Sequence, residues 1–211
     1  MQTKDATGIH IEGHIKIHDP VSKEIFIDKR NAIHYENISV ALAQSLADSG
    51  NGFVYQMAFG NGGTTIDPTG IITYLTPNTS GTNASLYNET YAKVVNQQSS
   101  NNTDPSRNFI ETRHVTGHNY TDLFVTCLLD YGEPGGQTAY DTTNSGESAY
   151  VFDELGLKSY SSAGNSLLLT HVVFHPVLKS EPMRPGPCVT AIRSRSAALT
   201  PAFLKDSSKT H

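Results

Sequence analysis

The protein has 211 residues, and its 15 Lys and Arg against 20 Asp and Glu give a formal charge of −5 at pH 7. Only 17% of the residues are charged and 37% are hydrophobic, whereas Thr, Ser, Asn and Gly number 22, 20, 14 and 17. This composition disfavours a helical bundle, which needs Ala, Leu, Glu and Lys, and is typical of β-sheets joined by many turns. With 10 Tyr and 8 Phe, the chain is also too apolar for charge-driven disorder.

Several classes of protein are disfavoured by simple features of the sequence. No run approaches ~18 apolar residues, so no membrane-spanning segment is predicted. The first seven residues contain no apolar run of the kind that a signal peptide needs, so we expect no secretory signal. Cys127 and Cys188 form no metal-binding pattern; they fit reduced thiols of a protein made in a cytoplasm, with a single bridge between them left open. The net acidic charge disfavours general nucleic-acid binding.

The N-terminal part predicts a β-hairpin. Residues 9–18 alternate between apolar and polar side chains, which is the period of a half-buried strand. A turn at residues 19–23 and a second apolar segment at 24–28 complete the hairpin.

Residues 36–48 change to a helical period. Their apolar positions follow i, i+3, i+4 spacing, which predicts one short amphipathic helix. Asn37 or Ser39 is the expected N-cap, and Gly50 or Gly52 the expected stop.

The rest of the chain predicts further strands separated by polar loops. The segment Leu-Leu-Leu-Thr-His-Val-Val-Phe-His-Pro-Val-Leu at 167–178 is continuously apolar, which indicates a strand buried on both faces. Its residues Leu167, Leu169, Val172 and Phe174 are therefore predicted core residues. The fold is predicted as mainly β, a β-sandwich-like antiparallel fold of about eight strands with one short helix. The other predicted strands are 53–59, 71–75, 91–96, 109–114, 120–129 and 149–157.

The charge balance changes at residue 181. Residues 1–180 total −8 and form the predicted β-rich domain, whereas residues 181–211 total +3 and are interrupted by four prolines. We interpret 181–211 as an extended basic arm that docks onto a neighbouring subunit or another protein. Its expected contact residues are Val189, Ile192, Arg193, Arg195, Leu199, Phe203 and Leu204.

Three features suggest chemistry but favour plainer interpretations. Histidines repeat at spacing four, as in His171 and His175, which on a strand separates them by ~13 Å, too far to share a metal. Gly60, Gly62 and Gly63 follow a strand as a phosphate loop would, but the lysine of such a loop is missing, so a tight turn with positive φ is the better interpretation.

Asp153 and Glu154 are the best-placed carboxylates for acid–base catalysis. Because adjacent strand residues point to opposite faces, they are not expected to form a facing pair. We therefore predict no enzyme activity, no metal and no cofactor.

Two functional classes remain from the residues. One is a structural protein that works by self-association and docking. The other is a carbohydrate-binding module, weakened by the absence of Trp. Tyrosines would then have to stack on sugars, and the candidates are Tyr74, Tyr87, Tyr91, Tyr131 and Tyr140.

Three segments in order resemble a family of tailed-bacteriophage virion structural proteins. The first is a short Ala/Leu helix followed by a strand and a Gly-rich turn, at 36–65. The second is Ala-Ser-Leu-Tyr-Asn-Glu-Thr-Tyr at 84–91. The third combines Tyr-Val-Phe-Asp-Glu-Leu-Gly-Leu at 150–157 with the apolar segment ending at Lys179. Together they cover roughly residues 9–180, and their order carries most of the resemblance.

The resemblance implies a β-rich virion component of the tail, baseplate, neck, fibre or head exterior, made in the host cytoplasm. Such proteins assemble with themselves, a trimer being the first expectation, and with other virion proteins. Glycan attachment is the alternative role. In this family a final alternating strand usually follows the Lys, but here the segment after Ser180 is rich in proline, which cannot donate ladder hydrogen bonds. Either another segment closes the sheet, or an open edge is left after Lys179 for a neighbour to fill; our oligomer prediction follows from the open edge.

Overall fold

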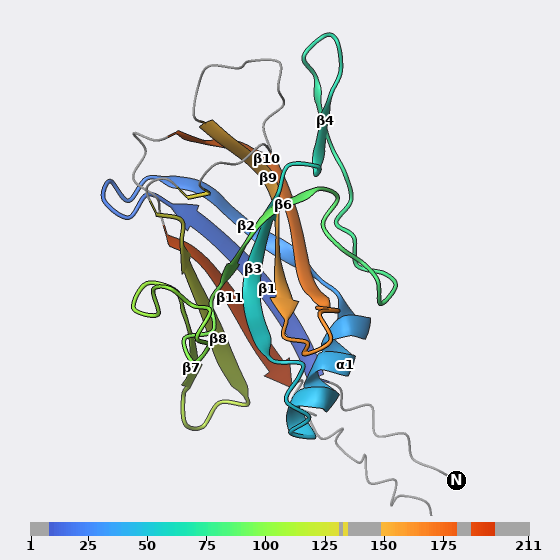
Figure 1. Ribbon diagram of the computed structural model, residues 1–211, viewed down its shortest axis with the longest axis vertical. Helices are drawn as coiled ribbons and strands as arrows, with labels where there is room; N and C mark the ends of the chain where they lie inside the picture. Colours follow the sequence, from blue (N-terminus) through green and yellow to red (C-terminus); the bar gives the residue numbers. More distant parts are fainter. Residues whose placement is uncertain (1–8, 131–132, 135–148, 181–186, 197–211) are drawn as a thin grey trace, which may run out of the picture.

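The computed structural model of the protein describes residues 9–130, 133–134, 149–180 and 187–196 (Figure 1). Within these ranges the chain forms eleven strands and a single helix, so the predicted mainly β class is confirmed. The elements in chain order are β1 (Ile9–His18), β2 (Ile25–Ile33), α1 (Tyr35–Leu46), β3 (Val54–Gly60), β4 (Thr64–Ile66), β5 (Ile72–Tyr74), β6 (Glu89–Val94), β7 (Phe109–His114), β8 (Tyr120–Leu128), β9 (Ala149–Ser159), β10 (Leu168–Ser180) and β11 (Pro187–Ser196).

Nine strands form one antiparallel sheet in the order β6-β3-β9-β10-β2-β1-β11-β8-β7. Strand β2 is shared, because residues 25–31 pair with β1 whereas Ala32 and Ile33 pair with β10. The sheet folds over at β2 into two layers that face each other (Figure 1). One hydrophobic cluster joins the layers, and it includes Ile15, Val125, Phe59 and Leu157. This is the predicted β-sandwich-like arrangement.

Strand β10 is the central apolar strand that its sequence predicts. Leu169, Val172 and Phe174 are buried, and Leu167 packs against the same cluster from a partly buried position. Phe174 lies edge-on to Phe152 of β9, with ring centroids 5.7 Å apart. Strands β9 and β2 flank β10 within the sheet, so it is an interior strand. Both of its faces are apolar because Leu169, Val172 and Phe174 pack in the main core, whereas Leu168 packs in a separate small cluster with Ala58 and Leu86.

Replacing Phe174 with alanine is therefore expected to destabilise the protein by about 3–5 kcal/mol, through lost burial and the cavity left behind. Urea-unfolding midpoints of the variant and the parent protein measure the difference. Leu178→Ala is the matched control, because Leu178 lies on the same strand but is 48% exposed, and it should cost less than about 1 kcal/mol. Equal effects of the two changes would contradict the assignment of Phe174 to the core.

The prediction of an open sheet edge after Lys179 is wrong. Strand β10 pairs with β9 as far as Ser180, and β11 from the predicted arm lies in the other half of the sheet between β1 and β8. The arm prediction for 181–211 is thus corrected for residues 187–196, which belong to the body. Pro187 is tolerated because it is the first residue of its strand. Val189, Ile192, Arg193 and Arg195 are strand residues, whereas Leu199, Phe203 and Leu204 lie outside the described residues.

Helix α1 begins one residue before the predicted range and ends two residues earlier. Its N-cap is His34 rather than Asn37 or Ser39: the His34 Nδ1 accepts a hydrogen bond from the Asn37 N–H at 3.2 Å. Asn37 is instead buried and donates its side-chain amide to the Leu168 carbonyl at 2.9 Å, which ties the helix to β10. After the helix, Gly52 has φ +87° and approaches the Ala41 carbonyl so closely that no Cβ fits there.

A long excursion between β3 and β6 covers the outer face of β9 and β10. Residues 61–88 include the β4–β5 hairpin, which projects from one end of the molecule (Figure 1). A small apolar cluster of Ala58, Leu86 and Leu168 lies beneath this segment and is separate from the main core. The layer that contains β9 and β10 is thus partly covered on both of its faces.

Candidate functional site

Two adjacent carboxylates on β9 hold the excursion in place. Glu154 is fully buried, and its Oε1 accepts hydrogen bonds from the N–H groups of Gly62 at 3.1 Å and Asn88 at 2.8 Å. Its Oε2 accepts from the Tyr87 N–H at 2.9 Å and lies 3.0 Å from the Nε2 of His171. Glu154 therefore receives four donors, three of them backbone groups of the covering segment.

Asp153, which is 3% exposed, binds the same segment one residue further along. Its two oxygens accept the N–H groups of Gly63 and Thr64, each at 2.9 Å, and the Thr64 hydroxyl. Although they are adjacent on β9, both carboxylates bind the backbone of residues 62–64. Both carboxylates are saturated by protein donors, so their present role is to anchor residues 62–64.

The glycines at 60, 62 and 63 are required for a different reason from the one predicted. None of the three has a positive φ. A Cβ on Gly60 would lie 2.4 Å from the Oε1 of Glu154, and one on Gly62 would lie 2.8 Å from Asn88. Glycine is needed here because the backbone comes close to the Glu154 carboxylate and to the loop at Asn88, and not because a turn requires positive φ.

The protonation of the buried pair follows from its hydrogen bonds. The Nδ1 of His171 accepts the Asn78 N–H at 2.7 Å, so its Nε2 carries the proton and donates to Glu154. Burial alone would raise the pKa of Glu154. The hydrogen bonds from His171 and from the N–H groups of Asn88, Tyr87 and Gly62 outweigh burial and hold that pKa below its ordinary value. The carboxylate is therefore ionised at neutral pH.

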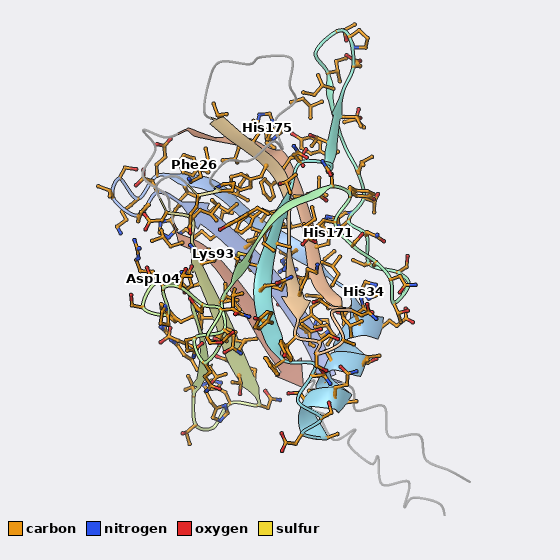
Figure 2. The ribbon with its side chains drawn as sticks, viewed as in Figure 1. Phe26, His34, Lys93, Asp104, His171 and His175 are labelled. Carbon is orange, nitrogen blue, oxygen red and sulfur yellow. The ribbon has the colours of Figure 1, made fainter. Side chains whose placement is uncertain are left out.

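Other histidines anchor the same excursion (Figure 2). The buried His34 donates from Nε2 to the Gly81 carbonyl at 3.0 Å, and His175 Nδ1 lies 3.1 Å from the Tyr74 hydroxyl. Between β1 and β2, the Nε2 of His14 lies 2.8 Å from the Oδ1 of Asp28 on the solvent face. In the described part of the chain, no group of three His, Cys, Asp or Glu residues is placed to hold a metal ion.

The tyrosines considered for sugar binding are distributed differently. The Tyr87 hydroxyl donates to the Thr76 carbonyl at 2.6 Å, and Tyr74 contacts His175. Tyr91 is partly buried next to the core ring of Phe59, and burial together with the nearby Glu133 raises its pKa to about 12. Tyr131 and Tyr140 lie outside the described residues.

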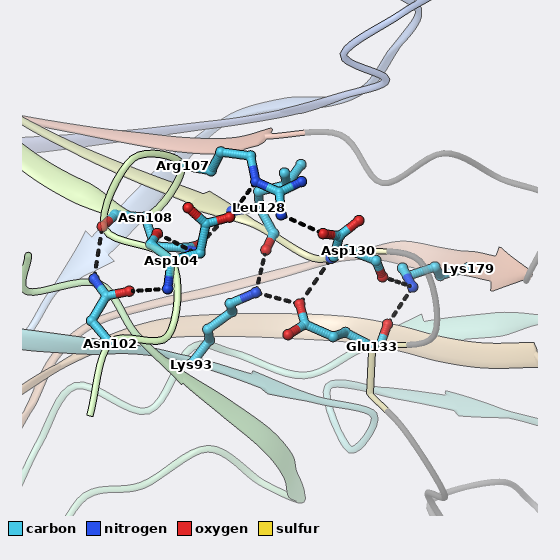
Figure 3. A network of polar contacts seen from close by, with 9 residues as sticks. All are labelled: Lys93, Asn102, Asp104, Arg107, Asn108, Leu128, Asp130, Glu133 and Lys179. Carbon is cyan, nitrogen blue, oxygen red and sulfur yellow. Dashed lines mark hydrogen bonds and ion pairs between the residues drawn. The ribbon is translucent and has the colours of Figure 1, made fainter. Parts of the chain in front are cut away.

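A second polar network links the edge strand β6 to the end of β8 and to the end of β10 (Figure 3). The nearly buried ammonium of Lys93 on β6 donates to the Leu128 carbonyl at the end of β8 and to the Glu133 carboxylate. Lys179 at the end of β10 donates to the carbonyls of Asp130 and Glu133.

Arg107 bridges Asp104 and Asp130 at the exposed side of this network. Hydrogen bonds from Ser106 and Arg107 lower the pKa of Asp104. The network connects β6, β8 and β10, so it closes one side of the sandwich.

An open apolar cavity of about 650 Å³ lies between the two layers at the end next to α1. Its walls come from both layers and from the helix, and they include Ile11, Ala41, Leu42, Val54, Leu123 and Leu169. Its size falls within the range of ~300–1,000 Å³ that is usual for binding pockets.

Apolar side chains at this end of the sandwich remain exposed. Ile9, Leu42 and Phe53, which line the cavity, are 58%, 38% and 37% exposed, and Leu46 one turn along the helix is 80% exposed. Contiguous exposed apolar surface of this kind marks interaction sites in soluble proteins. The predicted apolar face of α1 therefore faces this cavity as well as the core.

The sequence pattern contained part of this signal. The i, i+3, i+4 spacing in α1 identified Leu42 and Leu46 as apolar-face residues, but it could not show that the opposing layer leaves them uncovered.

Helix α1 has 12 residues and is too short to span a bilayer, and the described ranges contain no other helix. No family model, curated protein or solved structure matches this chain.

Proposed function

We propose that the protein is a non-enzymatic structural subunit that docks onto other copies of itself through the apolar cavity beside α1. The observation that carries this proposal is the cavity with its exposed rim of Ile9, Leu42 and Phe53. The buried carboxylates support it further, because their oxygens already accept protein hydrogen bonds. A protein ligand with apolar side chains fits such a cavity better than a charged small molecule.

The proposed occupant is the C-terminal segment 197–211 of a neighbouring copy. Strand β11 ends at Ser196, which pairs with Ile9 at the rim of the cavity. The fifteen residues beyond it include Leu199, Phe203 and Leu204, and a fully extended chain of this length reaches roughly 50 Å. Insertion of the C-terminal segment of one copy into the cavity of the next is a head-to-tail, heterologous contact, which builds rings or filaments.

The resemblance to tailed-bacteriophage structural proteins supports a virion as the assembly. Under this proposal the protein occupies the tail, baseplate, neck, fibre or head exterior, where it also docks to other virion proteins. A β-rich body with a terminal segment for docking suits that role, since each subunit then contacts its neighbour without a change in its own core.

The test compares the oligomeric state of the full chain with two variants. Deleting 197–211 removes the proposed occupant, and Leu42→Glu places a charge in the cavity. Both are expected to shift sedimentation to the monomer at concentrations where the full chain is oligomeric. Leu178→Glu is the matched control, because Leu178 is similarly exposed but lies at the opposite end of β10 from the cavity-lining Leu169.

Circular dichroism establishes that each variant is folded. A synthetic peptide of residues 197–211 should bind the truncated protein and not its Leu42→Glu version. A full chain that stays monomeric at high concentration, or a truncated chain that assembles normally, would overturn the proposal.

A further inference from the structure

Cys127 and Cys188 are 61 positions apart in the sequence, and the sheet places them at the same register position. In the antiparallel pairing of β8 with β11, Cys188 is the direct partner of Cys127. On its other side Cys188 pairs with Ile17 of β1. Directly opposite residues of antiparallel strands share one face of a sheet. Cys127 and Ile17 are both buried in the core cluster.

The spacing of such a row suits a disulfide. Opposite residues in an antiparallel pair have Cα atoms ~4.5–5.5 Å apart, and disulfides join Cα atoms ~4.4–6.8 Å apart. No backbone movement is needed to bring the two positions within bonding range. The Cys127 thiol is free in the structure.

We propose that Cys127 and Cys188 form an intramolecular disulfide that locks β11 into the sheet when the protein meets an oxidising environment. A small-molecule disulfide such as oxidised glutathione serves as the oxidant. One cysteine attacks it as a thiolate and releases one reduced glutathione, and the second cysteine then displaces the other. The two cysteines lose two protons and two electrons, and the oxidant becomes two thiols.

The surroundings of Cys127 predict slow bond formation in the folded protein. Burial raises the pKa of its thiol to about 12, with Lys93 lowering it and Glu133 raising it to a smaller extent. Very little thiolate exists there at neutral pH, and the oxidant cannot reach a fully buried sulfur. The disulfide should therefore form during folding, or when β11 opens transiently, and should persist once β11 is in place.

The experiment refolds the reduced, denatured full-length protein in native buffer that contains oxidised glutathione, and then counts free thiols after denaturation. We expect a decline from two thiols to none, a mass loss of two hydrogen atoms, and one peptide pair joined at Cys127 and Cys188 in a non-reducing digest. The melting temperature should rise by roughly 10 °C, because the bond closes a loop of about 60 residues in the unfolded chain.

A register-shifted variant provides the matched control. Cys188→Val combined with Val189→Cys moves the thiol by one residue, opposite Thr126, and so onto the other face of the sheet. This variant should keep both thiols under native conditions and cross-link as readily as the parent in guanidinium, where no register exists.

Several outcomes would overturn the inference. One is a parent protein that retains both thiols after folding in the oxidant; another is cross-linking between two chains instead of within one. A shifted variant that forms its bond as fast as the parent under native conditions would do so as well. The thiol count of the parent protein decides the question even if the variant does not fold.

Discussion

Deleting residues 187–211 is expected to abolish cooperative folding, whereas deleting 197–211 leaves the body intact. Strand β11 lies inside the sheet and pairs along its whole length with both neighbours, from Ile9 to Ile17 on β1 and from Tyr120 to Leu128 on β8. Its removal detaches β7 and β8 from β1 and exposes the core residues that this layer of the sandwich covers. The lost pairing and burial are comparable with the whole stability of a domain, about 5–15 kcal/mol.

Thermal unfolding followed by circular dichroism distinguishes the two deletions. The 1–196 chain should melt cooperatively near the temperature of the full protein, and the 1–186 chain should show no cooperative transition or should aggregate. If the 1–186 chain melted like the parent, β11 would not be an integral strand. This comparison also separates folding from assembly, because our proposal assigns docking to 197–211 and sheet formation to 187–196.

Replacing Glu154 with glutamine is expected to destabilise the protein by about 2–6 kcal/mol, because at least two buried donors each lose an acceptor at a cost of about 1–3 kcal/mol. An amide offers one acceptor oxygen, and its NH₂ group would face N–H donors that now bind the second carboxylate oxygen. At least two buried donors, such as the Tyr87 N–H and His171, would then lack an acceptor. The covering segment 61–88 should loosen first, since these bonds hold it to β9.

Urea unfolding measures the stability loss, and hydrogen exchange at Gly62, Tyr87 and Asn88 measures the loosening. Glu89→Gln is the matched control, because Glu89 makes a partly exposed ion pair with Lys158 that is worth at most ~1 kcal/mol. Similar losses for the two substitutions would refute the role assigned to Glu154.

The same site predicts an acid dependence. The folded-state pKa of Glu154 lies below its ordinary value of 4.5, so its ionised form stabilises the native state fully above that value. This contribution is lost as the pH falls below 4.5 and through the folded-state pKa. The difference in stability between the parent and Glu154→Gln should therefore be largest near neutral pH and should shrink in acid.

The sequence by itself determined the elements whose signal is local. Period-2 alternation in 9–18 predicts β1, the apolar run at 167–178 predicts β10, and the helical spacing at 36–48 predicts α1 to within two residues. These patterns work because burial of one face, or of both, imposes its own period on neighbouring residues. The burial of Leu169, Val172 and Phe174 followed from the same argument.

Only the tertiary structure decided the place of β11, the partners of Glu154 and the cavity beside α1. Each depends on groups far apart in the chain: β11 inserts between strands that begin at Ile9 and Tyr120, and Glu154 binds N–H groups of residues 62–88. Prolines and positive charge in 181–211 suggested an arm. That prediction was wrong for 187–196 because composition does not show which distant strands leave room for another strand between them. Glycine at 60 and 62 likewise suggested a turn, since the groups that crowd them, Glu154 at Gly60 and Asn88 at Gly62, are distant in the sequence. A local pattern states what one segment needs, and long-range packing determines which other segment provides it.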